Sequence, residues 1–280
     1  MNVTLPEKPK GSNRRIAIYM LIFILCVIAV GIAIYQFFAD EKLGVIVGIT
    51  SAKSEYIEEL KLDFNNLFEN KLVGNTDEQN IKKIVEDKNL VYTNYEKQEN
   101  SLNNYDINVH IPYINIDTDK VKKQNEEIKD IFEQIAEKTL QTQNRNIVYN
   151  VNYMACTENN ILYVVILSTF KEGTNVQRTI VQTYNYDLIN NKEVTINDVI
   201  KNNNIDKNEL QNRIKTEIEK AQKQAEELKN AGYSIFARNS KDDIYKLENA
   251  TEFFVKDGYL YLIYAYGNQN ETSEMDIVIY

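Results

Sequence analysis

One apolar segment constrains this chain more than any other feature. Residues 16–38 carry no charged side chain, and a helix that rises about 1.5 Å per residue needs roughly 20 residues to cross a hydrocarbon core of about 30 Å. The flanking charges are Lys8, Lys10, Arg14 and Arg15 before the segment and Asp40 and Glu41 after it. Because basic residues stay on the cytoplasmic side, the sequence predicts a short cytoplasmic tail at 1–15, a single-pass membrane helix at 16–38, and a C-terminal region outside the cell.

A cleaved signal peptide is the main alternative to a membrane helix. The apolar core of a signal peptide is shorter and ends at a small-x-small cleavage site, whereas here Phe37 stands two residues before Ala39. The length of the apolar segment and the lack of a cleavage site both indicate that the segment stays in the mature protein as a membrane helix. Ala29 and Ala33 lie one turn apart, a spacing that lets two membrane helices approach closely, so the segment also allows a homo-oligomer.

The region outside the membrane is strongly acidic. Residues 40–280 contain 28 basic and 40 acidic side chains, a net charge of −12. Such a surface repels nucleic acid and anionic lipid headgroups, so we expect no nucleic-acid partner. It favours a cationic protein as partner, although acidity also serves solubility alone.

Cysteine and histidine are too rare to build common catalytic or metal sites. Cys26 lies in the predicted membrane helix and Cys156 outside it, so they cannot form a disulfide and the fold must rest on its core. We expect Cys156 to be buried, because its neighbours are apolar. His110 is the single histidine, which excludes a zinc site made from a His pair, and its strand pattern indicates a surface position.

Acidic residues leave one catalytic alternative open. Asp117 and Asp119 have the spacing of a metal loop but lack its third acid and its glycine, and helix capping explains them better. Two carboxylates at suitable distance would make a wall hydrolase, yet no motif marks such a pair. We therefore expect a protein without catalytic residues, cofactor or metal.

The order of helical and strand patterns is typical of an α+β fold. Region 40–100 is predicted to hold a juxtamembrane amphipathic helix at 51–71, a shorter helix ending near Asp87, and a first strand. A first module at 101–183 and a second at 184–280 follow, each expected to be a long helix packed on a mainly antiparallel sheet. The predicted strands of this part are 105–111, 146–156, 161–170, 177–188, 253–256, 259–266 and 275–280.

Local signals mark where the helices and turns of the two modules begin. Asp117 or Thr118 is expected to cap a helix that reaches Leu140. Asp206, with Glu209 three residues later, opens the clearest helix of the chain. The pair Asp257-Gly258 predicts a tight hairpin turn.

Tyrosines supply the candidate ligand surface. Tyr184 and Tyr186 share one face of a predicted strand, and Tyr259 and Tyr261 share one face of another. Such rings stack on sugars or anchor a protein partner. Strand packing is the alternative, because aromatic residues favour strands wherever they serve the core.

Three stretches resemble a known extracytoplasmic family of Gram-positive bacteria. Residues 184–200 read Tyr-Asn-Tyr-Asp-Leu, a turn with Lys192, and Val-Thr-Ile-Asn-Asp-Val-Ile, while residues 253–260 read Phe-Phe-Val-Lys-Asp-Gly-Tyr-Leu. Residues 105–112 read Tyr-Asp-Ile-Asn-Val-His-Ile-Pro ahead of the helix that contains Val121. Over roughly residues 100–280 the pattern resembles the lysozyme-sensing ectodomain of the sigma-V anti-sigma factor and the accessory module of peptidoglycan deacetylases.

The resemblance implies a fold and a compartment, but it transfers no catalytic residue. The anti-sigma factor carries a sigma-binding domain before its membrane helix, and the deacetylase carries a metal-binding catalytic domain; the sequence shows neither. We therefore expect a membrane-anchored extracytoplasmic binding or sensing module that engages peptidoglycan or a secreted cationic protein such as lysozyme. A structural component of an envelope assembly is the alternative.

Overall fold

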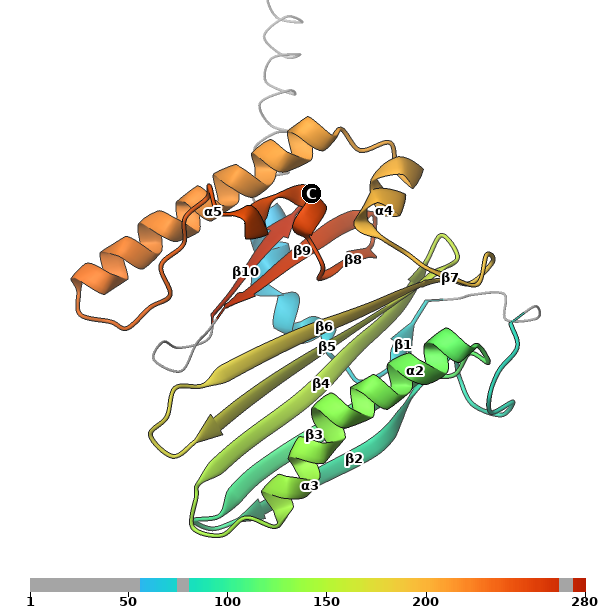
Figure 1. Ribbon diagram of the computed structural model, residues 1–280, viewed down its shortest axis with the longest axis vertical. Coiled ribbons are helices and arrows are strands. Elements are labelled where there is room, and N and C mark those ends of the chain that lie inside the picture. The colour runs from blue at the N-terminus through green and yellow to red at the C-terminus, as the bar shows by residue number, and fades with distance from the viewer. Residues whose placement is uncertain (1–55, 75–80, 267–273) are drawn as a thin grey trace, which may run out of the picture. The chain divides into compact units, whose positions relative to one another are not determined.

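The computed structural model describes residues 56–74, 81–266 and 274–280 (Figure 1). The chain divides into two compact units, Met1–Leu60 and Lys61–Tyr280, and the described residues of the first, 56–60, are helical. The predicted tail at 1–15 and membrane helix at 16–38 lie outside the described residues. Among the residues that are described, no helix has both the length and the apolarity to cross a membrane.

A seven-stranded mixed sheet organises the second unit, which is α+β as predicted. Its strands lie in the order β2 (Val91–Ser101), β3 (Tyr105–Ile114), β4 (Ile147–Glu158), β5 (Ile161–Glu172), β6 (Arg178–Asp187) and β7 (Lys192–Glu193), and β1 (Leu72–Val73) pairs with β4. The β2–β3, β4–β5, β5–β6 and β6–β7 pairs are antiparallel, in agreement with the expected mainly antiparallel sheet, whereas the β3–β4 and β1–β4 pairs are parallel. A parallel pair needs a crossover connection. For β3 and β4 a helical segment between the two strands supplies it.

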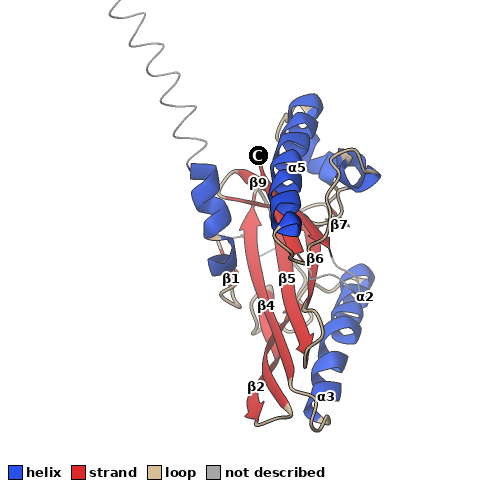
Figure 2. Ribbon diagram, turned by 90° about the vertical axis from the view of Figure 1, so that its left-hand side faces the viewer, coloured by secondary structure: helices blue, strands red, loops and turns tan. Residues whose placement is uncertain are grey.

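The crossover between β3 and β4 covers one face of the large sheet (Figure 2). It consists of α2 (Asp119–Ile128), one π-helical turn η2 (Lys129–Glu133) and α3 (Gln134–Leu140). Thr118 is the N-cap: its Oγ1 accepts a hydrogen bond from the backbone N–H of Val121 at 3.3 Å. Val121, Ile128 and Phe132 are fully buried against the strands, so the predicted helix is confirmed, with a π turn in its middle.

A smaller antiparallel sheet follows in the order β10-β9-β8. Its strands are β8 (Phe253–Lys256), β9 (Tyr259–Tyr266) and β10 (Glu274–Ile279). Asp257 and Gly258 have φ values of 52° and 78°, the positive values that a tight hairpin turn requires, so the predicted turn is confirmed. The chain segment between β7 and β8 forms four helical elements: α4 (Ile196–Asn202), α5 (Lys207–Asn230) and the 3-10 turns η3 (Asp243–Tyr245) and η4 (Leu247–Asn249).

Helix α5 begins where the sequence predicts it and packs on the small sheet through β10. The carboxylate of its N-cap, Asp206, accepts from the N–H groups of Asn208 at 2.7 Å and Glu209 at 3.1 Å. Leu210, Ile214 and Ile218 are fully buried along the predicted stripe, whereas Leu228 near its end is exposed.

The small sheet packs on the face of the large sheet that lies opposite α2 and α3. Asn185 of β6 donates from Nδ2 to the carbonyl of Phe253 at 2.8 Å, and Cys156 of β4 donates to the carbonyl of Val255 at 3.5 Å. This contact covers only one end of that face. Figure 2 shows no described helix or strand over the other end, where β2, β3 and β4 begin or finish.

Two expectations about the first part of the chain need correction. The predicted juxtamembrane helix is shorter: residues 56–62 are helical, and a 3-10 turn η1 (Phe64–Leu67) follows. Phe64 is buried, with its ring 6.3 Å from that of Phe254, so this part of the apolar stripe packs on the small sheet. The expected helix near Asp87 is absent from residues 81–90, which form bends and turns.

Candidate functional site

The four predicted tyrosines do not form a ligand surface. The exposed fractions of Tyr184, Tyr186 and Tyr261 are 5%, 3% and 2%, while Tyr259 is partly exposed. Tyr186 lies in the core under α2, and the ring of Tyr261 stacks on Phe254 with centroids 4.4 Å apart. Tyr184 and Tyr186 of β6 and Tyr261 of β9 therefore serve strand packing, the alternative that the sequence also allows.

His110 and Cys156 occupy the positions that the sequence indicates. His110 is partly exposed, with Nδ1 3.6 Å from Oε1 of Glu96 on the neighbouring strand. Cys156 is buried, and burial raises the pKa of its thiol to about 12. A thiol with so high a pKa stays protonated near neutral pH and is a poor nucleophile.

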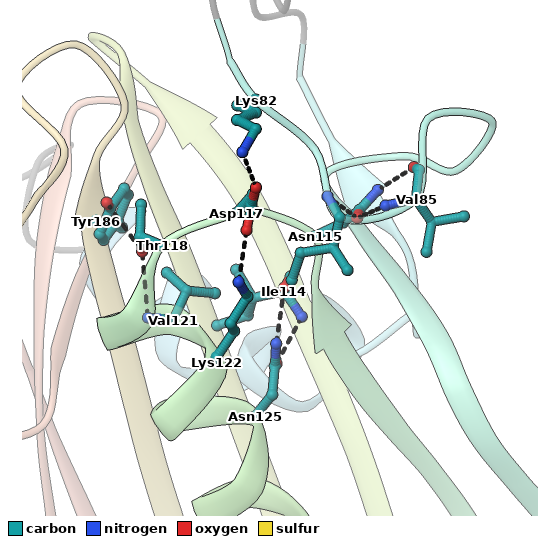
Figure 3. Close-up of polar contacts among 11 residues, drawn as sticks. Lys82, Val85, Ile114, Asn115, Asp117, Thr118, Val121, Lys122, Asn125 and Tyr186 are labelled. Carbon is teal, nitrogen blue, oxygen red and sulfur yellow. Dashed lines mark hydrogen bonds and ion pairs between the residues drawn. The ribbon is translucent and has the colours of Figure 1, made fainter.

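Asp117 is held by lysines (Figure 3). Its carboxylate forms ion pairs with Lys122 at 2.6 Å and with Lys82, and these two bonds hold its pKa at about 2. Thr118, and not Asp117, caps the helix. Over the described ranges, no group of three or more His, Cys, Asp or Glu side chains is placed to hold a metal ion.

A buried amide shapes the loop before β2, and sequence reasoning missed it. Asn115 is fully buried; its Oδ1 accepts from the N–H groups of Ile84 at 3.1 Å and Val85 at 2.8 Å, and its Nδ2 donates to the carbonyl of Val85 at 2.8 Å (Figure 3). These bonds occupy backbone groups that a helix would need, which explains the turns at 81–90. The available signal was one amide between two buried isoleucines, Ile114 and Ile116.

A row of uncharged polar side chains crosses the open part of the large sheet. Register places Gln98 opposite Asn108, Asn108 opposite Asn150, Asn150 opposite Thr169, and Thr169 opposite Thr179. We call these five residues the polar row. Since residues paired across strands share a face, the row runs over β2, β3, β4, β5 and β6 on the face away from α2 and α3.

The polar row is accessible and mostly unbonded within the protein. Gln98 is exposed and the other four members are partly exposed. Asn150 donates from Nδ2 to Thr169 Oγ1 at a long 3.4 Å, and among the described residues no hydrogen bond involves the side chains of Gln98, Asn108 or Thr179. Adjacent strands lie about 4.8 Å apart, so the row offers donors and acceptors over roughly 19 Å.

Charged and amide residues flank the polar row on the same face. The next pairs along the strands are Glu96 with His110 on one side and Asn100 with Asp106 on the other. Beyond His110, Asn152 accepts from Nδ2 of Asn70 at 2.9 Å. The face is therefore polar on β2 and β3, whereas Val148 of β4 and Leu167 of β5 place apolar side chains beside the polar row.

A groove of about 420 Å³ lies on the other face, beside the π turn. It is lined by Asn94, Tyr113, Lys122, Glu126 and Glu133, among others, where β2 carries an irregularity between Thr93 and Tyr95. Bulges and π turns often occur at functional sites. Here the lining carries both signs of charge and pairs with neighbours, as Lys122 does with Asp117, so it favours no single class of ligand.

The sequence signals for the polar row lie far apart in the chain. Asn108 lies on the wet side of the alternating pattern at 105–111, and Asn150 lies in an equally alternating strand. Nothing local shows that these two strands are neighbours, because the crossover at residues 115–146 separates them in the chain.

Comparison with known proteins adds a distant likeness. No family model and no curated protein matches the sequence. Among solved structures, a member of the DUF3298 family from Bacteroides fragilis aligns with 60% of this chain and 79% of its own length, at 13% sequence identity and a TM-score of 0.30. A TM-score this low does not establish a common fold.

Proposed function

We propose that this chain is a membrane-anchored extracytoplasmic binding module of the cell envelope, and that its polar row binds a neutral glycan of the wall. The row supports this proposal because it is accessible and uncharged. Amides and hydroxyls both donate and accept hydrogen bonds, which matches the hydroxyl and acetamido groups of wall sugars. The anchor is the predicted helix at 16–38.

A secreted cationic protein such as lysozyme is the second candidate ligand. The net charge of −12 over residues 40–280 favours it, since opposite net charge speeds encounter and is screened by salt. Binding to a neutral glycan through hydrogen bonds has no comparable salt dependence. The ionic strength therefore separates the two candidates.

The test is binding of the full chain to soluble peptidoglycan strands and to lysozyme, each at low and at physiological salt. The informative variant is Asn108→Leu with Asn150→Leu, which removes two amides from the polar row and keeps side-chain size. Asn212→Leu on the exposed surface of α5 is the matched control, because it removes an amide far from the row. We expect the double variant to weaken glycan binding about tenfold, as the loss of two hydrogen bonds implies.

Unaltered glycan binding by the double variant would remove the polar row from the proposal. Salt-sensitive binding of lysozyme together with weak glycan binding would favour the cationic-protein alternative. A chain that binds neither ligand would contradict both forms of the binding proposal.

A further inference from the structure

An apolar groove of about 310 Å³ lies at the end of α3, on the helix-covered face and away from the polar row. Its apolar lining comes from Ile135 of α3, Ile147 at the start of β4, Phe170 of β5 and Ile180 of β6. Ile180 is 39% exposed. The crossover helix ends at Leu140 and leaves these strand ends without a cover among the described elements.

Basic side chains surround this apolar groove in an otherwise acidic chain. Lys138, Arg145 and Arg178 line it, with Glu172 as the one acid. Arg145 forms an ion pair with Glu172, whereas Lys138 and Arg178 have no acidic partner in the described part of the chain. The groove therefore carries a local positive charge, opposite in sign to the net charge of −9.

Arg178 is held at the edge of the groove by its position in the sheet. It pairs directly with Phe170 across the β5–β6 ladder, and its guanidinium carbon lies 5.6 Å from the centre of the Phe170 ring. Contact with the aromatic face orients the guanidinium and leaves its N–H groups available. Lys138 lies in the last turn of α3, where a cation also favours the helix dipole.

We propose that this groove binds a short amphiphilic anion, an apolar chain that ends in a carboxylate or a phosphate. The apolar lining would take the chain, and Arg178 with Lys138 would take the anionic group. Arginine binds both carboxylate and phosphate through paired N–H donors. The volume is at the small end of the range for ligand pockets, which favours chains of about eight carbons.

The first experiment titrates the full chain, reconstituted in nanodiscs with labelled isoleucine methyl groups, with octanoate. The signal of the Ile180 methyl group reports binding at the groove and not partition into the lipid. Octanol and octylammonium have the same apolar chain without the negative charge, and octyl phosphate distinguishes the two anionic head groups. We expect saturable shifts of Ile180 with octanoate or octyl phosphate, and at least fivefold weaker effects with the other two, as a lost charge-assisted bond implies.

Variants then identify the groups that hold the anion. Arg178→Gln is expected to weaken octanoate binding about fivefold. Lys171→Gln is the matched control, since Lys171 follows Phe170 on β5 and points to the opposite face. An Ile180 signal that octanoate leaves unchanged would overturn the proposal, as would equal binding of octanol or an Arg178→Gln variant that binds like the parent chain. The polar row lies on the other face, so either proposal can fail alone.

Discussion

The side chain of Asn125 forms two hydrogen bonds with the backbone of one residue, Ile114. Its Oδ1 accepts from the N–H of Ile114 at 2.9 Å, and its Nδ2 donates to the carbonyl of Ile114 at 2.8 Å (Figure 3). The β3–β4 pairing ends at Val109 and Val151, so no strand pairs with β3 there on that side. The amide of α2 takes the place of the missing strand.

Replacing Asn125 by leucine should destabilise the fold. Both partners on Ile114 would become buried and unsatisfied, at a cost of about 2–4 kcal/mol in the free energy of unfolding. Urea unfolding measures this difference, and Asn212→Leu on the surface should change it by no more than about 0.5 kcal/mol. An Asn125→Leu chain as stable as its parent would show that water satisfies Ile114.

Glu217 of α5 should contribute stability that depends on pH. It is 6% exposed and contacts Lys61, Lys220 at 2.9 Å and Arg213 at 3.6 Å. Burial opposes its ionisation, but the bonds from Lys61 and Lys220 outweigh burial and lower its pKa below the ordinary 4.5. Because the pKa of Glu217 is lower in the folded chain than in the unfolded chain, its ionised carboxylate stabilises the fold at pH values above the unfolded pKa. This stabilisation is lost as the pH falls through the folded pKa.

The expected result is that Glu217→Gln lowers the free energy of unfolding at pH 7 by about 2 kcal/mol. The gap between variant and parent should narrow below about pH 4.5, the ordinary pKa of the group, as its carboxylate becomes protonated. Glu219→Gln, at an exposed site two residues on, controls for loss of a helix acid. A gap that stays constant with pH would contradict the assigned role of the charge.

Cys156 should resist thiol reagents until the fold opens. With a pKa of about 12, only about one thiol in ten thousand is ionised at pH 8, and burial excludes the reagent as well. In a Cys26→Ser background, we expect iodoacetamide to label the native chain far more slowly than the urea-unfolded chain. Equal labelling rates with and without urea would mean that Cys156 is accessible in the folded protein.

Tyr261 and Tyr259 should differ in their effect on stability although they share a strand face. Tyr261→Ala removes a buried ring that stacks on Phe254, and we expect it to cost about 3–4 kcal/mol, as for other large core residues. Tyr259→Ala, at a partly exposed position, should cost distinctly less. Thermal unfolding of both variants checks the order, and similar losses would contradict the burial difference.

Local signals predicted most of the long elements of this fold, but not the short elements β1, β7 and α4. Alternation at 105–111 predicts β3, the cap at Thr118 predicts α2, Asp206 predicts α5, and Asp257-Gly258 predicts the β8–β9 turn. Each signal depends on residues within a few positions of one another, because capping and turn geometry are local hydrogen-bonding problems. The exception at 81–90 has a distant cause, since the amide of Asn115 reorganises that backbone.

Long-range packing decided the candidate surfaces. The sequence alone determined the charge, the strand alternation and the polar character of Asn108 and Asn150. Only the tertiary structure decided that β3 and β4 are parallel neighbours, which joins these amides in one row. It also decided that Tyr186 is buried in the core with α2 and that Tyr261 is buried against Phe254. The physical reason is that a strand pattern states which side chains share a face, whereas exposure depends on what another part of the chain places against that face.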